Sequence, residues 1–105
     1  MAAMKIEWIA NQILGGDYIY SCHADQERRN DSFSVTEIEE VLTHGEIIED
    51  YPDDPRGPSC LVCGEAGQRS VHVVCGTNSI DKLFIITIYG PRPPKWPTPR
   101  ERYRK

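Results

Sequence analysis

The sequence predicts an α+β fold in which N-terminal helices pack on one face of a three- to five-stranded antiparallel sheet. Three observations lead to this fold class. The first part of the chain carries helical periodicity, the later part forms short runs rich in β-branched and aromatic side chains, and only short connections join those runs. Such connections permit hairpins but not the long crossovers that a parallel sheet needs.

The N-terminal segment predicts an amphipathic helix followed by two short elements. Within residues 4–14, apolar side chains recur at the spacing of one helix face, and Gly15-Gly16 ends the run. Residues 17–21 then read as a short strand, and residues 22–30 as a polar helix.

A further helix is predicted to begin after Ser34. Ser34 and Glu37 have the spacing of a capping box, in which a hydroxyl and a carboxylate satisfy the first free backbone N–H groups. The helix is expected to end at His44-Gly45. Its buried face is formed by Ile38, Val41 and Leu42.

Four strands are predicted to follow. Residues 46–51 and 59–65 form the first two, separated by a loop rich in Pro and Asp. Residues 69–76 and 83–89 form a hairpin whose loop contains Asn78 and Asp81. The last strand is almost continuously apolar, which predicts a place in the middle of the sheet with both faces covered.

Polar side chains interrupt this apolar hairpin. Strict alternation along a strand places His72 with Val74 on one face. It also places four residues of the last strand on one face: Leu83, Ile85, Thr87 and Tyr89. We expect the two rows to lie on the same side of the sheet, looking toward His23.

Charge divides the chain into two parts. Residues 1–91 carry six Lys/Arg against fifteen Asp/Glu, a net charge of −9, whereas residues 92–105 carry six Lys/Arg against one Glu, a net charge of +5. We therefore expect one domain over residues 1–91 and a Pro-rich basic arm over residues 92–105, with Trp96 as the residue that could pin the arm to the body. A basic arm suits nucleic acid or an acidic partner, and equally a solvated terminus.

The N-terminus carries neither a signal peptide nor an apolar run long enough to span a bilayer, so we expect a cytoplasmic protein that does not interact with membranes. Four cysteines in that compartment are thiols or metal ligands rather than disulfides.

A zinc site is one alternative for these thiols. Cys60 and Cys63 have Cys-x-x-Cys spacing, and His72 and Cys75 would complete four ligands. Residues three apart on a strand point to opposite faces, however, and two thiols packed as small apolar side chains is the other interpretation. A Cys-His nucleophile pair, Cys22 with His72 or Cys75 with His23, has no supporting sequence context.

A metal-independent ribonuclease site is a second alternative. His23 and His72 would act as base and acid, Tyr89 would orient the phosphate, and arginines would stabilise the phosphorane. The candidate arginines are Arg28, Arg29 and Arg69. Each histidine could instead be a satisfied core or surface residue.

Five stretches occur in an order that resembles the bacterial and archaeal domain-of-unknown-function family 4258. They are Tyr20–Ala24, Glu37–Leu42, Gly45–Tyr51, Ser70–Val74 and Ile86–Tyr89. The tail Pro93–Trp96 resembles one branch of that family.

The resemblance implies a fold like that of RelE-like, BrnT-like and barnase-like ribonucleases of toxin–antitoxin pairs, with RNA as substrate and no cofactor. It also implies an antitoxin-like partner of the zinc-finger, helix-turn-helix type. The family motifs correspond to His23, His72, Thr87 and Tyr89. Many members carry arginines one and two turns after the first histidine, where this chain has Glu27 and Asp31. Two other classes of function remain open, a non-enzymatic protein-binding module and a small zinc-binding domain.

Overall fold

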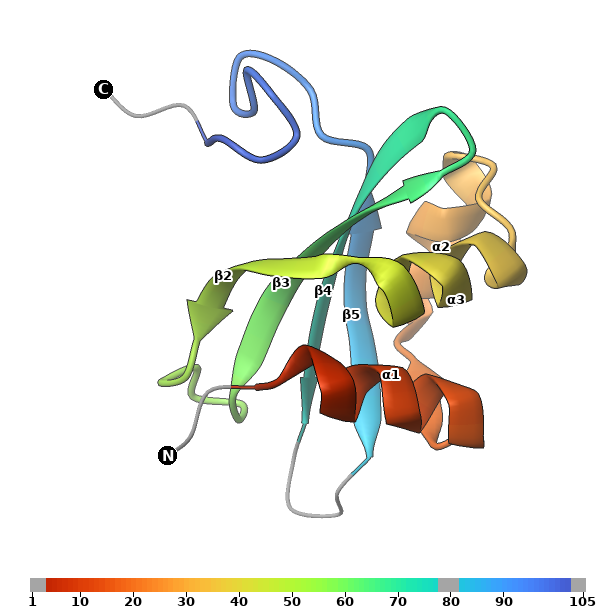
Figure 1. The fold of residues 1–105 in the computed structure, drawn as a ribbon, viewed down its shortest axis with the longest axis vertical. Coiled ribbons are helices and arrows are strands. Elements are labelled where there is room, and N and C mark those ends of the chain that lie inside the picture. Colours follow the sequence, from red (N-terminus) through yellow and green to blue (C-terminus); the bar gives the residue numbers. More distant parts are fainter. Residues whose placement is uncertain (1–3, 78–81, 103–105) are drawn as a thin grey trace.

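The computed structural model describes residues 4–77 and 82–102. The chain forms three helices and a five-stranded sheet (Figure 1). The elements in chain order are α1 (Ile6–Gly15), β1 (Tyr18–Tyr20), α2 (Cys22–Asn30), α3 (Val35–His44), β2 (Glu46–Tyr51), β3 (Ser59–Ala66), β4 (Arg69–Thr77) and β5 (Leu83–Tyr89). The α+β class is confirmed, and the helices follow the predicted caps. Ser34 and Glu37 form both halves of the capping box, and Gly16 ends α1 in the left-handed conformation. The predicted hairpin residues Asn78 and Asp81 lie outside the described residues.

The sheet is mixed, with strand order β1-β5-β4-β3-β2. The prediction of a purely antiparallel sheet is wrong at one edge, because β1 runs parallel to β5. The other three strand pairs, β2–β3, β3–β4 and β4–β5, are antiparallel. The difference arises because β1 and β5 are the first and last strands of the chain, so no short turn between them dictates an antiparallel pair.

The hydrophobic core lies between the sheet and helices α1 and α3, and one face of the sheet carries no helix (Figure 1). Helix α2 packs against β5 and contributes Ala24 to the same core. The fully buried core side chains include Ile9, Ile38, Val41, Leu42, Val62, Val71, Val73, Ile85 and Ile88. In the described part of the chain, no helix is long and apolar enough to cross a bilayer.

Beyond β1, helix α2 closes the outer edge of β5. The backbone N–H of Ile88 donates to Glu27 Oε1 at 2.9 Å, and the hydroxyl of Ser21 donates to the carbonyl of Ile86 at 3.0 Å. Side chains thus satisfy edge groups that a neighbouring strand would otherwise pair.

Two β-bulges reverse which side chains face the helices. In β5 the register passes from Cys75↔Ile85 to Val74↔Thr87, so Ile86 is the extra residue. One extra residue shifts the alternation by one position. Leu83 and Ile85 therefore face the core, whereas Thr87 and Tyr89 face the helix-free side, and the prediction that these four share one face is wrong.

The second bulge lies in β2. Ile47 pairs with Val62 on the core side, but Glu49 pairs with Leu61, so Ile48 is the extra residue. Without this bulge Glu49 would share the face of Ile47 and enter the core. With it, Glu49 joins the helix-free face.

Gly45, which precedes β2, and Gly15, at the end of α1, should differ sharply in how well they tolerate replacement by alanine. A Cβ on Gly45 would lie 2.4 Å from the carbonyl oxygen of Val41 and 2.6 Å from that of Cys63. We expect Gly45→Ala to lower the free energy of unfolding by about 1–3 kcal/mol or more, because backbone atoms must move. Chemical denaturation measures this change.

Gly15→Ala is the matched control, since its Cβ would meet only the Asp17 carboxylate at 3.7 Å. Gly15 is the last residue of α1, and alanine there should be neutral or stabilising by up to about 1 kcal/mol. Equal effects of the two substitutions would contradict the close approach at Gly45.

Candidate active site on the helix-free face

The helix-free face gathers polar side chains from three strands. His72 on β4 is the register partner of Tyr89 on β5, and Val74 pairs with Thr87 beside them. On the other flank of β4, His72 pairs with Cys63 of β3, and Glu49 of β2 pairs with Leu61. His72, Tyr89 and Glu49 thus share one face of the sheet.

His72 is fully buried and both ring nitrogens have partners. Nε2 lies 2.6 Å from the carbonyl oxygen of Pro99, and Nδ1 lies 3.1 Å from the hydroxyl of Tyr89. A carbonyl can only accept, so Nε2 carries the proton, and in the neutral ring Nδ1 accepts from Tyr89. Burial lowers the pKa of His72 below its ordinary value, which agrees with a neutral imidazole.

The covering over His72 comes from the C-terminal arm, which loops over one end of the sheet (Figure 1). The indole of Trp96 is buried and meets the His72 ring edge-on, with 4.4 Å between ring centroids. Tyr89 contacts the same imidazole edge-on at 5.1 Å, and burial raises the pKa of its phenol. The arm therefore closes this part of the face to solvent.

An ion pair between the arm and β2 lies next to this cluster. Arg102 donates to both carboxylate oxygens of Glu49, at 2.7 and 2.9 Å, and its guanidinium lies 4.8 Å from the Trp96 ring centroid. Tyr51 also donates to Glu49, and burial followed by this hydrogen bond raises the pKa of Tyr51 to about 12. The Glu49 charge acts on His72 as well, raising its pKa against the effect of burial.

His23 does not belong to this cluster. It lies in the first turn of α2 with 70% of its side chain exposed, and it pairs with Glu27 at 3.2 Å. The partners of His72 come from β5 and the arm, so the structure does not bring the two histidines into contact. His72, Thr87 and Tyr89 do lie on one side of the sheet, but they face the arm and not His23. Helix α2 follows the edge of β5 and does not cross the helix-free face.

The predicted arginines do not lie together either. Arg28 is held internally, donating to Asp25 and to the carbonyl of Phe33, and Arg29 pairs with Asp25 on the surface. Arg69 stacks on Phe33 and borders a groove that also includes Gly90, the residue after Tyr89.

The four residues of the alternative zinc site fall on opposite faces of the sheet. Cys60 and Cys75 are neighbours in the core, with 3.9 Å between their sulfur atoms, whereas Cys63 and His72 lie on the helix-free side. The described residues contain no group of three or more ligands that could hold a metal ion. All four cysteines, including the exposed Cys22, are free thiols.

A protein-family model matches residues 20–90, about two-thirds of the chain, with the description "Domain of unknown function (DUF4258)". The chain belongs to the DUF4258 family. No curated protein and no solved structure matches it. His72, Tyr89 and Glu49 lie within the matched part of this DUF4258 chain, whereas Trp96, Pro99 and Arg102 lie beyond it.

Two members of the cluster were missed by sequence reasoning. Glu49 reads as an ordinary strand carboxylate, because only the β2 bulge turns it to the face of His72. Arg102 reads as one of several arm cations. The dense prolines before it predict an extended arm, but the structure shows turns at residues 93–95 and 99–100, and nothing local in the sequence records where the arm lies.

The buried imidazole predicts a pH dependence of stability. The unfolded chain binds a proton at His72 near the ordinary pKa of 6.5, while the folded protein stays neutral to lower pH. Stability from this group is therefore complete above pH 6.5 and declines as pH falls below it, by at most about 1.4 kcal/mol per pH unit. His72→Gln should flatten the unfolding free energy between pH 6.5 and 5.5, as measured by urea denaturation.

His44→Gln is the control, since His44 is exposed on α3 and pairs with Glu40. The slope of that variant is the reference for the His72→Gln protein. A His72→Gln protein with that same slope would show that His72 is not buried in its neutral form.

Proposed function

We propose that this protein is a metal-independent endoribonuclease of the toxin type that cleaves single-stranded RNA in the cytoplasm. The observation that carries the proposal is the pair of bulges, which place Glu49 and Tyr89 on the face of His72. Bulges commonly re-aim side chains next to active sites. A carboxylate and an imidazole on one face are the base and acid that this reaction needs.

The proposed roles follow from these positions. Glu49 takes the proton of the ribose 2′-hydroxyl, and the 2′-oxygen attacks the phosphorus atom. The bond from phosphorus to the 5′-oxygen breaks, and the imidazolium of His72 protonates the departing oxygen through Nε2. The products are a 2′,3′-cyclic phosphate and a free 5′-hydroxyl. Tyr89 holds Nδ1 and so fixes the direction of Nε2.

The arm masks both groups in the closed structure. The Pro99 carbonyl occupies the hydrogen-bond position that the leaving oxygen would take, and Arg102 covers the Glu49 carboxylate. Burial by the arm also keeps His72 neutral, whereas the acid must be protonated. Lifting the arm would open the face, free the base and return the pKa of His72 toward its ordinary value.

The contacts that keep the arm on the sheet are few enough to allow such opening. Among its described residues the arm makes two ion pairs with the body, Arg100 with Glu46 and Arg102 with Glu49. These side chains are partly exposed, and such pairs contribute about 1 kcal/mol or less. The main anchor is the indole of Trp96, which is 2% exposed.

Trp96→Ala therefore tests the proposal in the full-length protein. We expect it to raise the cleavage rate of a fluorogenic single-stranded RNA, in excess chelator, by about tenfold or more, a gain that corresponds to roughly 1.4 kcal/mol of closure. Adding His72→Gln or Glu49→Gln to this variant should lower the rate by about 10²–10⁴-fold. His44→Gln in the same background should leave it unchanged.

Circular dichroism establishes that each variant is folded, and Arg102→Gln offers a milder way to loosen the arm. Intact RNA after incubation with both folded, loosened variants would reject the enzyme. The helix-free face would then be a protein-docking surface, since it already holds a Pro- and Trp-containing segment. An antitoxin-like zinc-finger, helix-turn-helix protein is the partner we propose for that face.

A further inference from the structure

We propose that a groove at the end of β4 and β5 binds the phosphate backbone of single-stranded RNA, with Arg92 as its principal charge and Arg69 as its fixed wall. This inference rests on the proposed function, because it supplies that active site with a path for the substrate strand. Arg92 belongs to neither the family motifs nor the predicted site.

The groove has a volume of about 550 Å³ and lies between the α2–α3 turn, the start of β4 and the root of the arm. Its lining consists of Asn30, Asp31, Ser32, Phe33, Arg69, Ser70, Gly90, Pro91, Arg92 and Pro99. Ligand pockets typically measure about 300–1,000 Å³, so this groove has room for roughly one nucleotide. A duplex would not enter it, which favours an unpaired strand.

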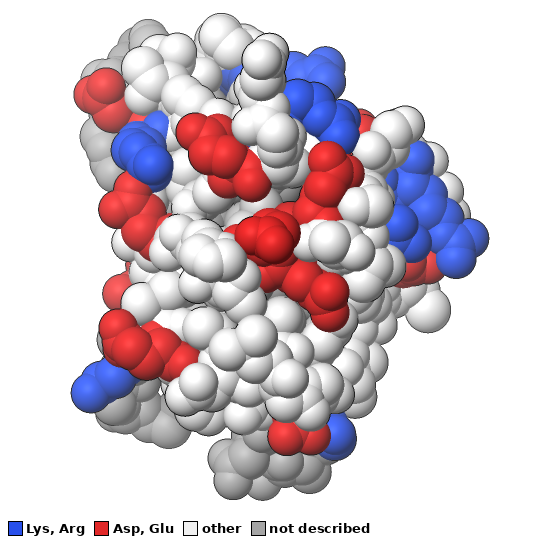
Figure 2. Space-filling view, turned by 45° about the vertical axis from the view of Figure 1, so that its right-hand side comes forward, with Lys and Arg blue, Asp and Glu red and all other residues white. Residues whose placement is uncertain are grey.

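The charge of this groove is opposite to that of the body. Arg69 and Arg92 outnumber Asp31 in its lining, although residues 1–91 together carry a net charge of −9. Three other cavities in the described chain have linings in which acidic residues equal or outnumber Lys and Arg. Figure 2 shows acidic side chains gathered across the middle of one face, with basic side chains toward its edges. This contrast favours the groove over the acidic middle of that face as the place where a polyanion binds.

Arg69 is rigidly placed. Its guanidinium lies 4.0 Å from the Phe33 ring centroid and donates to the carbonyls of Asp31 and Ser32, at 2.8 and 3.0 Å. The carboxylate of Glu37 lies 3.8 Å away and offsets part of its charge. Arg69 thus shapes the groove more than it binds.

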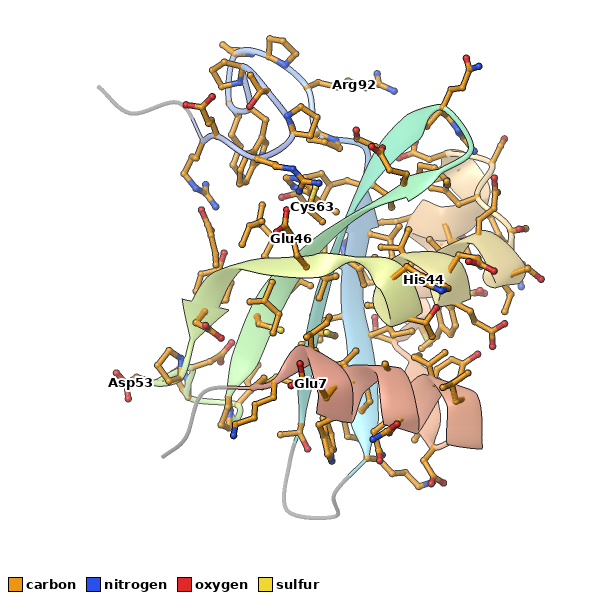
Figure 3. All side chains as sticks on the ribbon, in the orientation of Figure 1. Glu7, His44, Glu46, Asp53, Cys63 and Arg92 are labelled. Atoms are coloured by element: carbon orange, nitrogen blue, oxygen red, sulfur yellow. The ribbon has the colours of Figure 1, made fainter. Side chains whose placement is uncertain are left out.

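Arg92 is placed to bind. Its side chain is exposed and makes no hydrogen bond or ion pair with any residue that the structure describes. In Figure 3 it extends away from the arm loop. A phosphate would give this cation an ionic partner, and a guanidinium binds phosphate oxygens through its planar fork.

The groove leads directly to the proposed active site. Pro99 lines the groove, and the same residue's carbonyl accepts from His72. The rest of the lining belongs to the body or to residues 90–92, at the root of the arm. When residues 96–102 lift away, the groove therefore keeps Arg69 and Arg92 and opens toward His72 and Tyr89. A strand bound in the groove would then continue across that face.

A binding experiment separates the groove from the chemistry. The probe is a fluorescein-labelled octaribonucleotide with 2′-O-methyl groups, which cannot be cleaved, and the readout is fluorescence anisotropy between 50 and 200 mM salt on full-length Trp96→Ala protein. We expect Arg92→Ala to weaken binding about fivefold or more and to reduce the slope of log K against log salt by roughly 0.7–1. Arg92→Lys should restore part of the binding.

Arg56→Ala is the matched control, because Arg56 is exposed and lies in the β2–β3 loop, at the opposite end of β3 and β4. It should change binding by less than about twofold. No binding of the probe, equal losses in Arg56→Ala and Arg92→Ala, or equally tight binding of a duplex of the same length would each overturn the inference.

Failure of the inference and failure of the proposed function give different results. Probe binding that depends on Arg92, together with uncleaved RNA, would reject the enzyme and keep the groove. Cleavage with an unchanged KM in Arg92→Ala would keep the enzyme and reject the groove.

Discussion

The burial of His72 is the constraint on which this arrangement depends. An imidazole in the middle of a sheet has two nitrogens that must both be satisfied, because a buried polar group without a partner costs about 1–3 kcal/mol. Tyr89 serves one nitrogen from the neighbouring strand, and Pro99 serves the other from the arm. Neither partner is optional while the ring is buried. The position of the arm is thus linked to the protonation state of one side chain, and opening the arm changes the chemistry of His72 as well as its exposure.

The two faces of the sheet differ in the side chains that they carry and in the segments that cover them. The core side is largely apolar and carries the packing of α1 and α3. The opposite side holds the histidine, the tyrosine and the glutamate, and it is covered by a segment outside the part that defines the family. This division agrees with the proposal that the arm controls access to the site.

The bulges show how local irregularity creates such a site. With regular alternation in β2, Glu49 would lie on the core side of the sheet. With regular alternation in β5, either Thr87 and Tyr89 would lie on the opposite face from His72, or Ile85 would leave the core. One extra residue in each of β2 and β5 lets apolar residues stay buried at one end of the strand while polar residues reach the other face. Each bulge leaves its extra residue without a paired residue in the neighbouring strand.

The sequence by itself determined the α+β class, the helix caps and the positions of the last four strands, because these depend on contacts within a few residues. The capping box at Ser34 and the apolar stripe of α1 needed no knowledge of the rest of the chain. The tertiary structure alone decided three things: the parallel β1–β5 pair, the faces of Glu49 and Tyr89, and the place of the arm. Each depends on pairing between segments far apart in sequence, where register is set by which side chains the core can bury. His72 and Tyr89 were predicted to lie on the same side of the sheet, and they do. Their separation from His23 was not predicted, because nothing local records that α2 lies along the edge of the sheet.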